Sequence, residues 1–167
     1  MHLQYKFMTW NNHMASTLLT VGWREWVLLP ELGLPVIKAK VDTGARTSCL
    51  HAFSVELFTK DDEEWVRFGI HPHQDDTETE VYSEAKVIDK RTVSDSGGHK
   101  EERYVINTEV ILGDHRWPIE ITLTNRDTML FRMLLGRTAM EHKLIVNPGK
   151  SFLLGEPTPI NNIEQSL

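Results

Sequence analysis

Short alternating segments separated by turn residues run along most of this chain and restrict its fold more than any other feature. Apolar and polar residues alternate over residues 36–42 and 116–124, as they do in strands with one buried face. Further strands are predicted at 23–29, 64–70, 79–93 and 102–112, and on both sides of a turn at 147–149. A single short helix is predicted at 137–142. Many short strands with regular turns predict an all-β barrel or sandwich.

The chain has 167 residues, which is the size of one domain. Asn11, Asn12 and His13 interrupt any apolar period at the start, so residues 1–20 are predicted to form an N-terminal extension. Prolines and asparagines near the end predict a loose tail over residues 156–167. The folded domain is then expected at residues 21–155.

Composition excludes several classes of function. The net charge of −6 argues against a basic nucleic-acid surface, and no apolar run approaches the roughly 18 residues that a membrane span needs. Cys49 is the only cysteine, which rules out an intramolecular disulfide and a Cys-based zinc site. Because no signal peptide is visible either, we expect a cytoplasmic protein that binds neither nucleic acid nor membrane.

The segment formed by Asp42, Thr43, Gly44 and Ala45 follows directly after one of the alternating strands. Such a strand holds the carboxylate of Asp42 still, and Gly44 lets the backbone approach closely. A carboxylate fixed on a tight turn suits the activation of a water molecule. The alternative is a turn that merely ends a strand, and the tripeptide Asp-Thr-Gly alone does not distinguish the two.

A second motif lies far downstream, where Leu134, Leu135, Gly136 and Arg137 precede the predicted helix. Together with the Asp42 segment, it resembles the paired motifs of the retropepsin-like aspartic proteases. The resemblance is closer still to a bacterial branch whose loop reads Asp-Thr-Gly-Ala-Arg-Thr-Ser-x-Leu-His-Ala, which residues 42–52 match. Proteins of that branch are labelled putative ATP-dependent zinc proteases and are linked with ATP-grasp ligases that add glutamates. The resemblance covers roughly residues 21–155 and implies a closed antiparallel β-barrel of the retropepsin type.

The resemblance also implies a mode of action. Since the chain has one Asp-Thr-Gly, an active enzyme would be a homodimer in which two Asp42 carboxylates share a proton and activate water, without a cofactor. Thr43 would hydrogen-bond across the two-fold axis. The bound peptide would be contacted by Ala45 and Arg46, and by a hairpin flap containing Gly97 and Gly98. The substrate would be a peptide or protein, with glutamylated tails as one candidate, and an ATP-grasp ligase is a candidate partner.

Arg46 departs from the viral retropepsins, which carry Asp at this position. A nearby cation favours ionised carboxylates, so Arg46 would either influence the catalytic pair or bind an acidic substrate. Arg103 and Arg137 would supply further cations. The alternative is a surface arginine that pairs with one of the many glutamates.

Two readings from other functional classes stay open. The chain would keep the same motifs as a catalytically silent barrel that binds a peptide or a ligase partner. A zinc hydrolase needs at least three converging ligands, and the nearest candidates are His71 and His73 beside Asp75 and Asp76, a pattern that a solvated loop also gives. No metal site is therefore expected.

Two further patterns have simple structural explanations. Cys49 and His51 would point to the same side of a strand, as a nucleophile and its base would, but a small buried cysteine gives the same pattern. Gly149, Lys150 and Ser151 look like the end of a phosphate loop that lacks its first glycine, so no nucleotide binding is expected.

Overall fold

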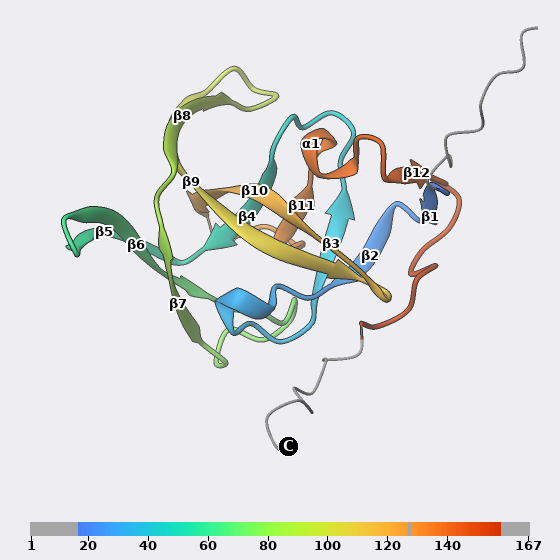
Figure 1. Cartoon of the computed structure of the whole chain (residues 1–167), viewed down its shortest axis with the longest axis horizontal. Helices are drawn as coiled ribbons and strands as arrows, with labels where there is room; N and C mark the ends of the chain where they lie inside the picture. The colour runs from blue at the N-terminus through green and yellow to red at the C-terminus, as the bar shows by residue number, and fades with distance from the viewer. Residues whose placement is uncertain (1–16, 127, 158–167) are drawn as a thin grey trace, which may run out of the picture.

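The computed structural model describes residues 17–126 and 128–157, which form three β-sheets, a 3-10 turn and a short α-helix (Figure 1). The largest sheet has seven strands in the order β2-β3-β11-β4-β10-β9-β8. Their bounds are β2 (Arg24–Val27), β3 (Ile37–Val41), β4 (Ser48–Ala52), β8 (Asp89–Ser94), β9 (Lys100–Leu112), β10 (His115–Asn125) and β11 (Met133–Leu135).

The other elements are smaller. A three-stranded sheet contains β5 (Ser54–Lys60), β6 (Glu63–Ile70) and β7 (Val81–Lys86). A two-stranded sheet pairs β1 (Leu19–Val21) with β12 (Leu144–Val146). The turn η1 spans Pro30–Leu32, and the helix α1 spans Arg137–Met140. No helix in the described ranges has the length and apolar character that crossing a bilayer requires.

Strand β11 joins the two sequence motifs. It lies between β3 and β4, parallel to β3 and antiparallel to β4. Strand β3 leads into the Asp42 segment and β4 follows it, so the loop from residue 42 to residue 47 connects the two neighbours of β11. Since Gly136 and Arg137 directly follow β11, the fold brings the downstream motif beside this loop.

One face of the seven-stranded sheet is the core. Leu50, Ile121, Met133 and Leu135 are completely buried on it, because burial of apolar surface is the main favourable term in folding. The three-stranded sheet contributes Phe68, also fully buried, to the same cluster. The sheet that carries the Asp42 loop is therefore held from one side by continuous apolar packing.

The opposite face, which we call the outer face, is largely polar. The strand register places Arg24 opposite Lys40, Lys40 beside Leu134, Leu134 beside Cys49, and Cys49 beside Thr122. Residues aligned across neighbouring strands point to the same side of a sheet. These five residues therefore form one row across the outer face. In the sequence, Lys40 lies two residues before Asp42.

The mainly β fold is confirmed, but the predicted closed barrel is wrong for the described residues. The seven-stranded sheet ends at β2 and β8, and an isolated bridge between Leu28 and Ile111 links the chain after β2 to β9. The predicted strand 79–93 is also two strands in separate sheets. Val87 N–H donates to Glu64 O, whereas Ile88 N–H donates to Val105 O, each at 2.9 Å. The chain thus changes its hydrogen-bonding partner between these residues, which divides the sheets.

Other elements follow the predictions in part. Helix α1 is confirmed, although it ends at Met140. The predicted strand after the turn at 147–149 is wrong, since residues 151–155 contain no strand. Strand β1 begins at Leu19 and takes the end of the predicted extension into the fold. The rest of that extension (1–16) and most of the predicted tail (158–167) lie outside the described residues.

Candidate active site

The carboxylate of Asp42 is fixed by its own loop. Its Oδ1 accepts hydrogen bonds from Gly44 N–H at 2.9 Å and from Ala45 N–H at 3.2 Å. The Asp42 N–H donates to Leu135 O at 2.9 Å, which anchors the residue to β11. A β-carbon on Gly44 would lie 3.1 Å from Asp42 Oδ1, so a side chain there would press on the carboxylate. The half-buried Asp42 is thus held in one orientation at the end of β3.

Gly136 lets β11 pass close to the loop. A β-carbon at this position would lie 2.5 Å from the carbonyl carbon of Thr47, a distance that backbone cannot accommodate without moving. The Gly136 N–H donates to Ser48 Oγ at 3.0 Å. Ser48 is completely buried, and its carbonyl accepts a hydrogen bond from Thr122 Oγ1 at 3.2 Å. The glycine of the second motif is therefore required by space.

Arg137 binds the Asp42 loop through its main chain and its side chain. Its N–H donates to Ala45 O at 2.9 Å, and its Nη1 donates to both Thr43 O and Gly44 O at 3.0 Å. Thr138 N–H donates to Arg46 O at 2.9 Å. Arg137, a predicted cation for the substrate, thus has its Nη1 occupied by two carbonyls of the loop.

The predicted hairpin is present between β8 and β9. Oδ1 of Asp95 accepts hydrogen bonds from Gly97 N–H and His99 N–H, both at 2.9 Å, and Gly98 has a φ of 81°. Asp95 Oδ2 lies 3.5 Å from Arg126 Nη2, just after β10. The hydrogen bond from His99 N–H is the main cause that lowers the pKa of Asp95. Asp95 thus shapes the tip of the hairpin and ties it to β10, while the tip forms no hydrogen bond to the Asp42 loop in the described structure.

Arg46 is exposed and lies near an acidic side chain. Glu120 is hydrogen-bonded by Arg91 Nη1 at 2.6 Å, which is the main cause that lowers its pKa; the charge of Arg46 adds to this. Arg91 also pairs with Asp89 at 2.7 Å. Arg46 therefore lies in the field of a surface carboxylate, Glu120, whose hydrogen bond comes from Arg91. Thr43 is exposed and Ala45 is half-buried.

Cys49 and His51 lie on the outer face but are both buried, at 3% and 4% exposure. Burial raises the pKa of the Cys49 thiol, although Arg103, whose Nη1 lies 3.5 Å from Sγ, opposes the shift. Burial, assisted by Arg103, Arg126 and Arg132, lowers the pKa of His51 to about 4. A protonated thiol beside a neutral imidazole is not a thiolate pair, so this environment favours the structural explanation.

Arg103 contacts Cys49, and the periodicity of the sequence does not predict this contact. It lies on β9, its Nε donates to Glu101 at 2.9 Å, and its side chain is mostly buried. The sequence predicts Arg103 only as one of three cations for an acidic substrate. The alternation of β9 does place it on the same side as Glu101, but its contact with β4 depends on the order of strands in the sheet.

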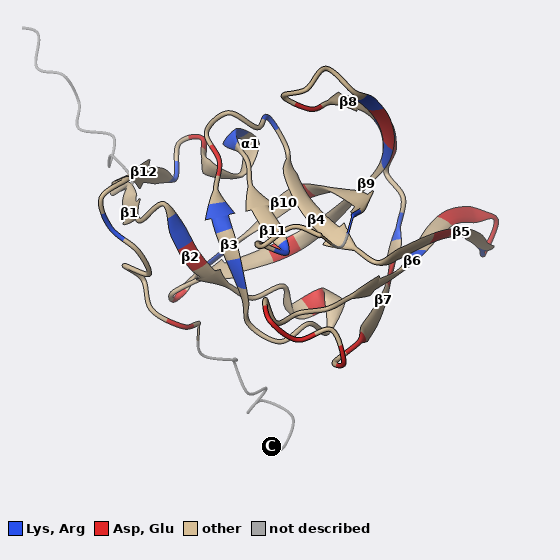
Figure 2. Cartoon of the chain, turned by 180° about the vertical axis from the view of Figure 1, so that it is seen from behind, with Lys and Arg blue, Asp and Glu red and all other residues tan. Residues whose placement is uncertain are grey.

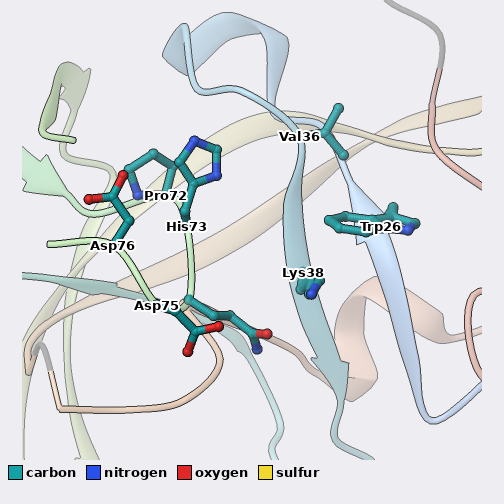
Figure 3. A pocket seen from close by; sticks show the side chains of 8 residues that line it. Trp26, Val36, Lys38, Pro72, His73, Asp75 and Asp76 are labelled. Carbon is teal, nitrogen blue, oxygen red and sulfur yellow. The ribbon is translucent and has the colours of Figure 1, made fainter. Parts of the chain in front are cut away.

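The two histidines of the candidate metal pattern, His71 and His73, lie in different environments. His71 is buried and stacks on Phe53, with ring centroids 4.4 Å apart. His73 is exposed and, with Asp75 and Asp76, lines an open pocket of about 280 Å³ whose other wall contains Trp26, Val36 and Lys38 (Figure 3). Across the described ranges, no three His, Cys, Asp or Glu side chains converge as metal ligands would.

Comparison with known proteins gives the family. The model of the RimB-like family, described as the retropepsin-like aspartic endopeptidase RimB, matches residues 20–157. This range contains both motifs and the hairpin between them.

Curated relatives carry a different name. A protein of Shewanella halifaxensis is 46% identical over 152 residues, which are 91% of this chain and 33% of the relative. A protein of Desulfotalea psychrophila is 50% identical over 136 residues, 81% of this chain and 29% of the relative. Both are named "Probable alpha-L-glutamate ligase". The chain therefore spans about a third of the length of these relatives.

A solved structure supports the fold. The crystal structure of a Legionella pneumophila protein of unknown function matches with a TM-score of 0.68 and 27% identity. The match covers 83% of this chain and 99% of the other. Together with the motif geometry and the match over residues 20–157, this leads to one conclusion: the chain belongs to the RimB-like family of retropepsin-like aspartic endopeptidases.

Proposed function

We propose that this chain is the protomer of a homodimeric aspartic endopeptidase in which Asp42 and its copy in the second chain activate water. The observation that carries the proposal is the fixed Asp42 carboxylate, whose Oδ1 accepts two loop N–H groups while Arg137 holds the carbonyls behind it. Preorganised groups of this kind are what a catalytic constellation requires. Family membership supports the same assignment.

The chemistry follows from two carboxylates in close contact. Like charges about 3 Å apart do not both ionise, so the pair holds one shared proton and titrates as a unit. The ionised partner removes a proton from water, and the protonated partner donates to the scissile carbonyl. Water attacks that carbonyl, the C–N bond breaks, and the amine leaves with a proton. Each protomer supplies a single Asp-Thr-Gly, so the site is incomplete without the second copy.

The remaining site residues have secondary roles in the proposal. Thr43 bonds across the two-fold axis, since its side chain is exposed at the loop. Ala45 and Arg46 contact the peptide, and the hairpin with Gly97 and Gly98 closes over it. A peptide in extended form would pair with these segments through its backbone. The described chain contributes no metal-ligand cluster to the reaction as proposed.

We propose an acidic protein tail as the substrate, with glutamylated tails the leading case. Relatives whose name is "Probable alpha-L-glutamate ligase" contain a region that matches this chain. An endopeptidase in the same polypeptide as a glutamate ligase would act on the ligase's product. An ATP-grasp ligase is accordingly a proposed partner, and any dependence on ATP would belong to that partner.

The match to a region of the ligase-named relatives favours a second candidate function. Because the matched region is about a third of each relative, the alternative is a catalytically silent module that binds a ligase or its peptide. In that case Asp42 would stabilise the loop without catalysing a reaction.

One experiment separates the two candidates. Wild-type protein and Asp42→Asn are incubated with oligoglutamate and with a neutral peptide, and cleavage is followed by mass spectrometry. Asn keeps an oxygen that accepts the Gly44 and Ala45 N–H groups, so the loop should stay intact while turnover is lost. Equal cleavage by both proteins, or by a strictly monomeric wild type, would remove the proposed mechanism. A ligase that binds both proteins without any cleavage would support the silent module.

A further inference from the structure

Three cations lie together on the outer face of β2 and β3. The register places Arg24 directly opposite Lys40 and Trp26 opposite Lys38. Alternation along β3 puts Lys38 and Lys40 on the same side, and Asp42 follows Lys40 after one further alternation. We call the surface formed by Arg24, Lys38 and Lys40 the cationic face. Figure 2 shows strands β2 and β3 side by side, each with basic residues in blue.

None of these three cations has a carboxylate partner within the part of the chain that the structure describes. Several basic side chains on other strands pair with acids, as Lys86 does with Glu63 and Arg91 with Glu120, each at 2.6 Å. Like charges at directly opposite positions of an antiparallel pair destabilise it. A chain with a net charge of −6 has acids to spare, so unneutralised cations in direct opposition indicate a function rather than a structural need.

Aromatic rings hold two of the cations in place. The Arg24 guanidinium lies 4.6 Å from the centre of the Trp23 ring and 5.0 Å from that of Phe152, and its Nε donates to Ser151 Oγ at 3.1 Å. Lys38 Nζ lies 5.1 Å from the centre of the Trp26 ring. Side chains already ordered in this way lose less conformational entropy when they bind an anion.

The cationic face ends at an acidic pocket wall. Lys38 lines the pocket of Figure 3, and Asp75 and Asp76 are on its opposite wall. The Asp76 carboxylate accepts hydrogen bonds from the Thr79 hydroxyl and from the N–H groups of Glu78 at 2.8 Å and Thr79 at 3.2 Å, which lower its pKa. Acidic ligand groups would be attracted between Asp42 and Lys38 and repelled beyond the pocket.

We infer that the cationic face binds carboxylates of an acidic peptide whose backbone passes Asp42, which makes Arg24, Lys38 and Lys40 specificity-determining residues. The inference rests on the proposed peptidase function. The inference adds to that function the place where the charge of the substrate is recognised. This place is the β2–β3 side of the scissile bond, along the length of β3. Arg24 and Lys40 contact the acidic residues nearest the reacting bond, and Lys38 contacts those further along.

The test uses binding without turnover. Oligoglutamate and a neutral peptide of the same length are titrated into the full-length Asp42→Asn protein, with and without Lys38→Gln and Lys40→Gln. We expect the double substitution to weaken oligoglutamate binding about three- to tenfold, because exposed ion pairs contribute modestly, and to leave the neutral peptide unaffected. The difference should shrink as salt is raised. Lys60→Gln is the matched control, since Lys60 also lies over a tryptophan, 4.6 Å from the Trp65 ring, but on the other sheet.

The outcomes separate this inference from the proposed function. Cleavage of oligoglutamate by wild type with unchanged affinity in the double variant would overturn the inference and leave the peptidase intact. Charge-dependent binding without any cleavage by wild type would overturn only the peptidase. If the double variant changed the oligomeric state and left peptide affinity unchanged, the face would be an interface between copies, and the inference would be wrong.

Discussion

Gly136 lies so close to Thr47 that a β-carbon on the glycine would be 2.5 Å from the threonine carbonyl carbon. The backbone of Gly136 is extended, with φ −91° and ψ 174°, so other residues would tolerate its conformation. Only the space beside Thr47 requires glycine. This crossing fixes β11 against the loop that carries Asp42.

Gly136→Ala should therefore destabilise the fold by about 2–3 kcal/mol, the cost of forcing a methyl group into a packed site. Thermal or urea unfolding measures the change in free energy. Gly149→Ala is the matched control, because a β-carbon there would lie 3.5 Å from Asn147 Oδ1, an ordinary contact. Equal unfolding midpoints for the two variants would show that the chain near Thr47 yields easily.

Arg137→Gln should loosen the Asp42 loop. The substitution removes the guanidinium that binds Thr43 O and Gly44 O, and hydrogen bonds from charged groups contribute about 1.5–3 kcal/mol when buried and less at an exposed position. We expect faster hydrogen exchange at the Gly44 and Ala45 amides, and at least a tenfold loss of any peptidase activity. Arg116→Gln, which breaks a surface pair with Glu109, is the control. Unchanged exchange at the loop would contradict the role assigned to Arg137.

Because of His51, the folded domain should become less stable as the pH falls. Its pKa is lowered from 6.5 to about 4, mainly by burial, so the unfolded chain binds a proton in this range that the folded chain does not. Stability therefore rises with pH between about 4 and 6.5, by up to about 3 kcal/mol from this group. The difference in unfolding free energy between wild type and His51→Gln should change over this interval. Parallel pH profiles would show that His51 titrates normally.

Asp95 should control the exchange of the hairpin amides. Asp95→Ala removes the acceptor for Gly97 and His99 N–H, whereas Asp95→Asn keeps an acceptor and loses only the charge facing Arg126. Hydrogen exchange at the tip should be fast in the first variant and nearly normal in the second.

The pH dependence of the hairpin has the same sign as that of His51 but lies at lower pH, because the pKa of each group is lowered in the folded chain. The pKa of Asp95 is lowered from 3.8, chiefly by the His99 N–H, so its contribution is complete above 3.8 and is lost as pH falls through the lower folded value. Loss of amide protection already at pH 6 would contradict this assignment.

Regular alternation was enough to predict the strands that have one buried and one polar face. Strands β3 and β10 are of this kind, and both were predicted within one or two residues. Alternation did not predict strand β4, because all of Ser48–Ala52 is buried; a strand there was assumed only for the pair Cys49 and His51. Strand β11 has three residues and is defined by its pairing with β3 and β4 rather than by its own sequence pattern.

The site was predictable where it depends on local sequence. The Asp42 turn and the presence of Gly136 follow from the two motifs, and their juxtaposition came from the resemblance to a family. The role of Arg137 depends on which way two carbonyls point. The lowered pKa of His51 depends first on burial and then on the charges of arginines from distant segments. Such effects arise from strand order, which alternation does not specify.

The insertion of β11 between β3 and β4 has a consequence for biosynthesis. Arg137 and Thr43, which are joined by a hydrogen bond, are 94 residues apart in the chain. Contacts of such long sequence separation form slowly, because closing the long loop between them costs conformational entropy. A polypeptide still emerging from the ribosome has the Asp42 segment long before it has β11, so the loop stays unassembled until nearly the whole domain has been translated.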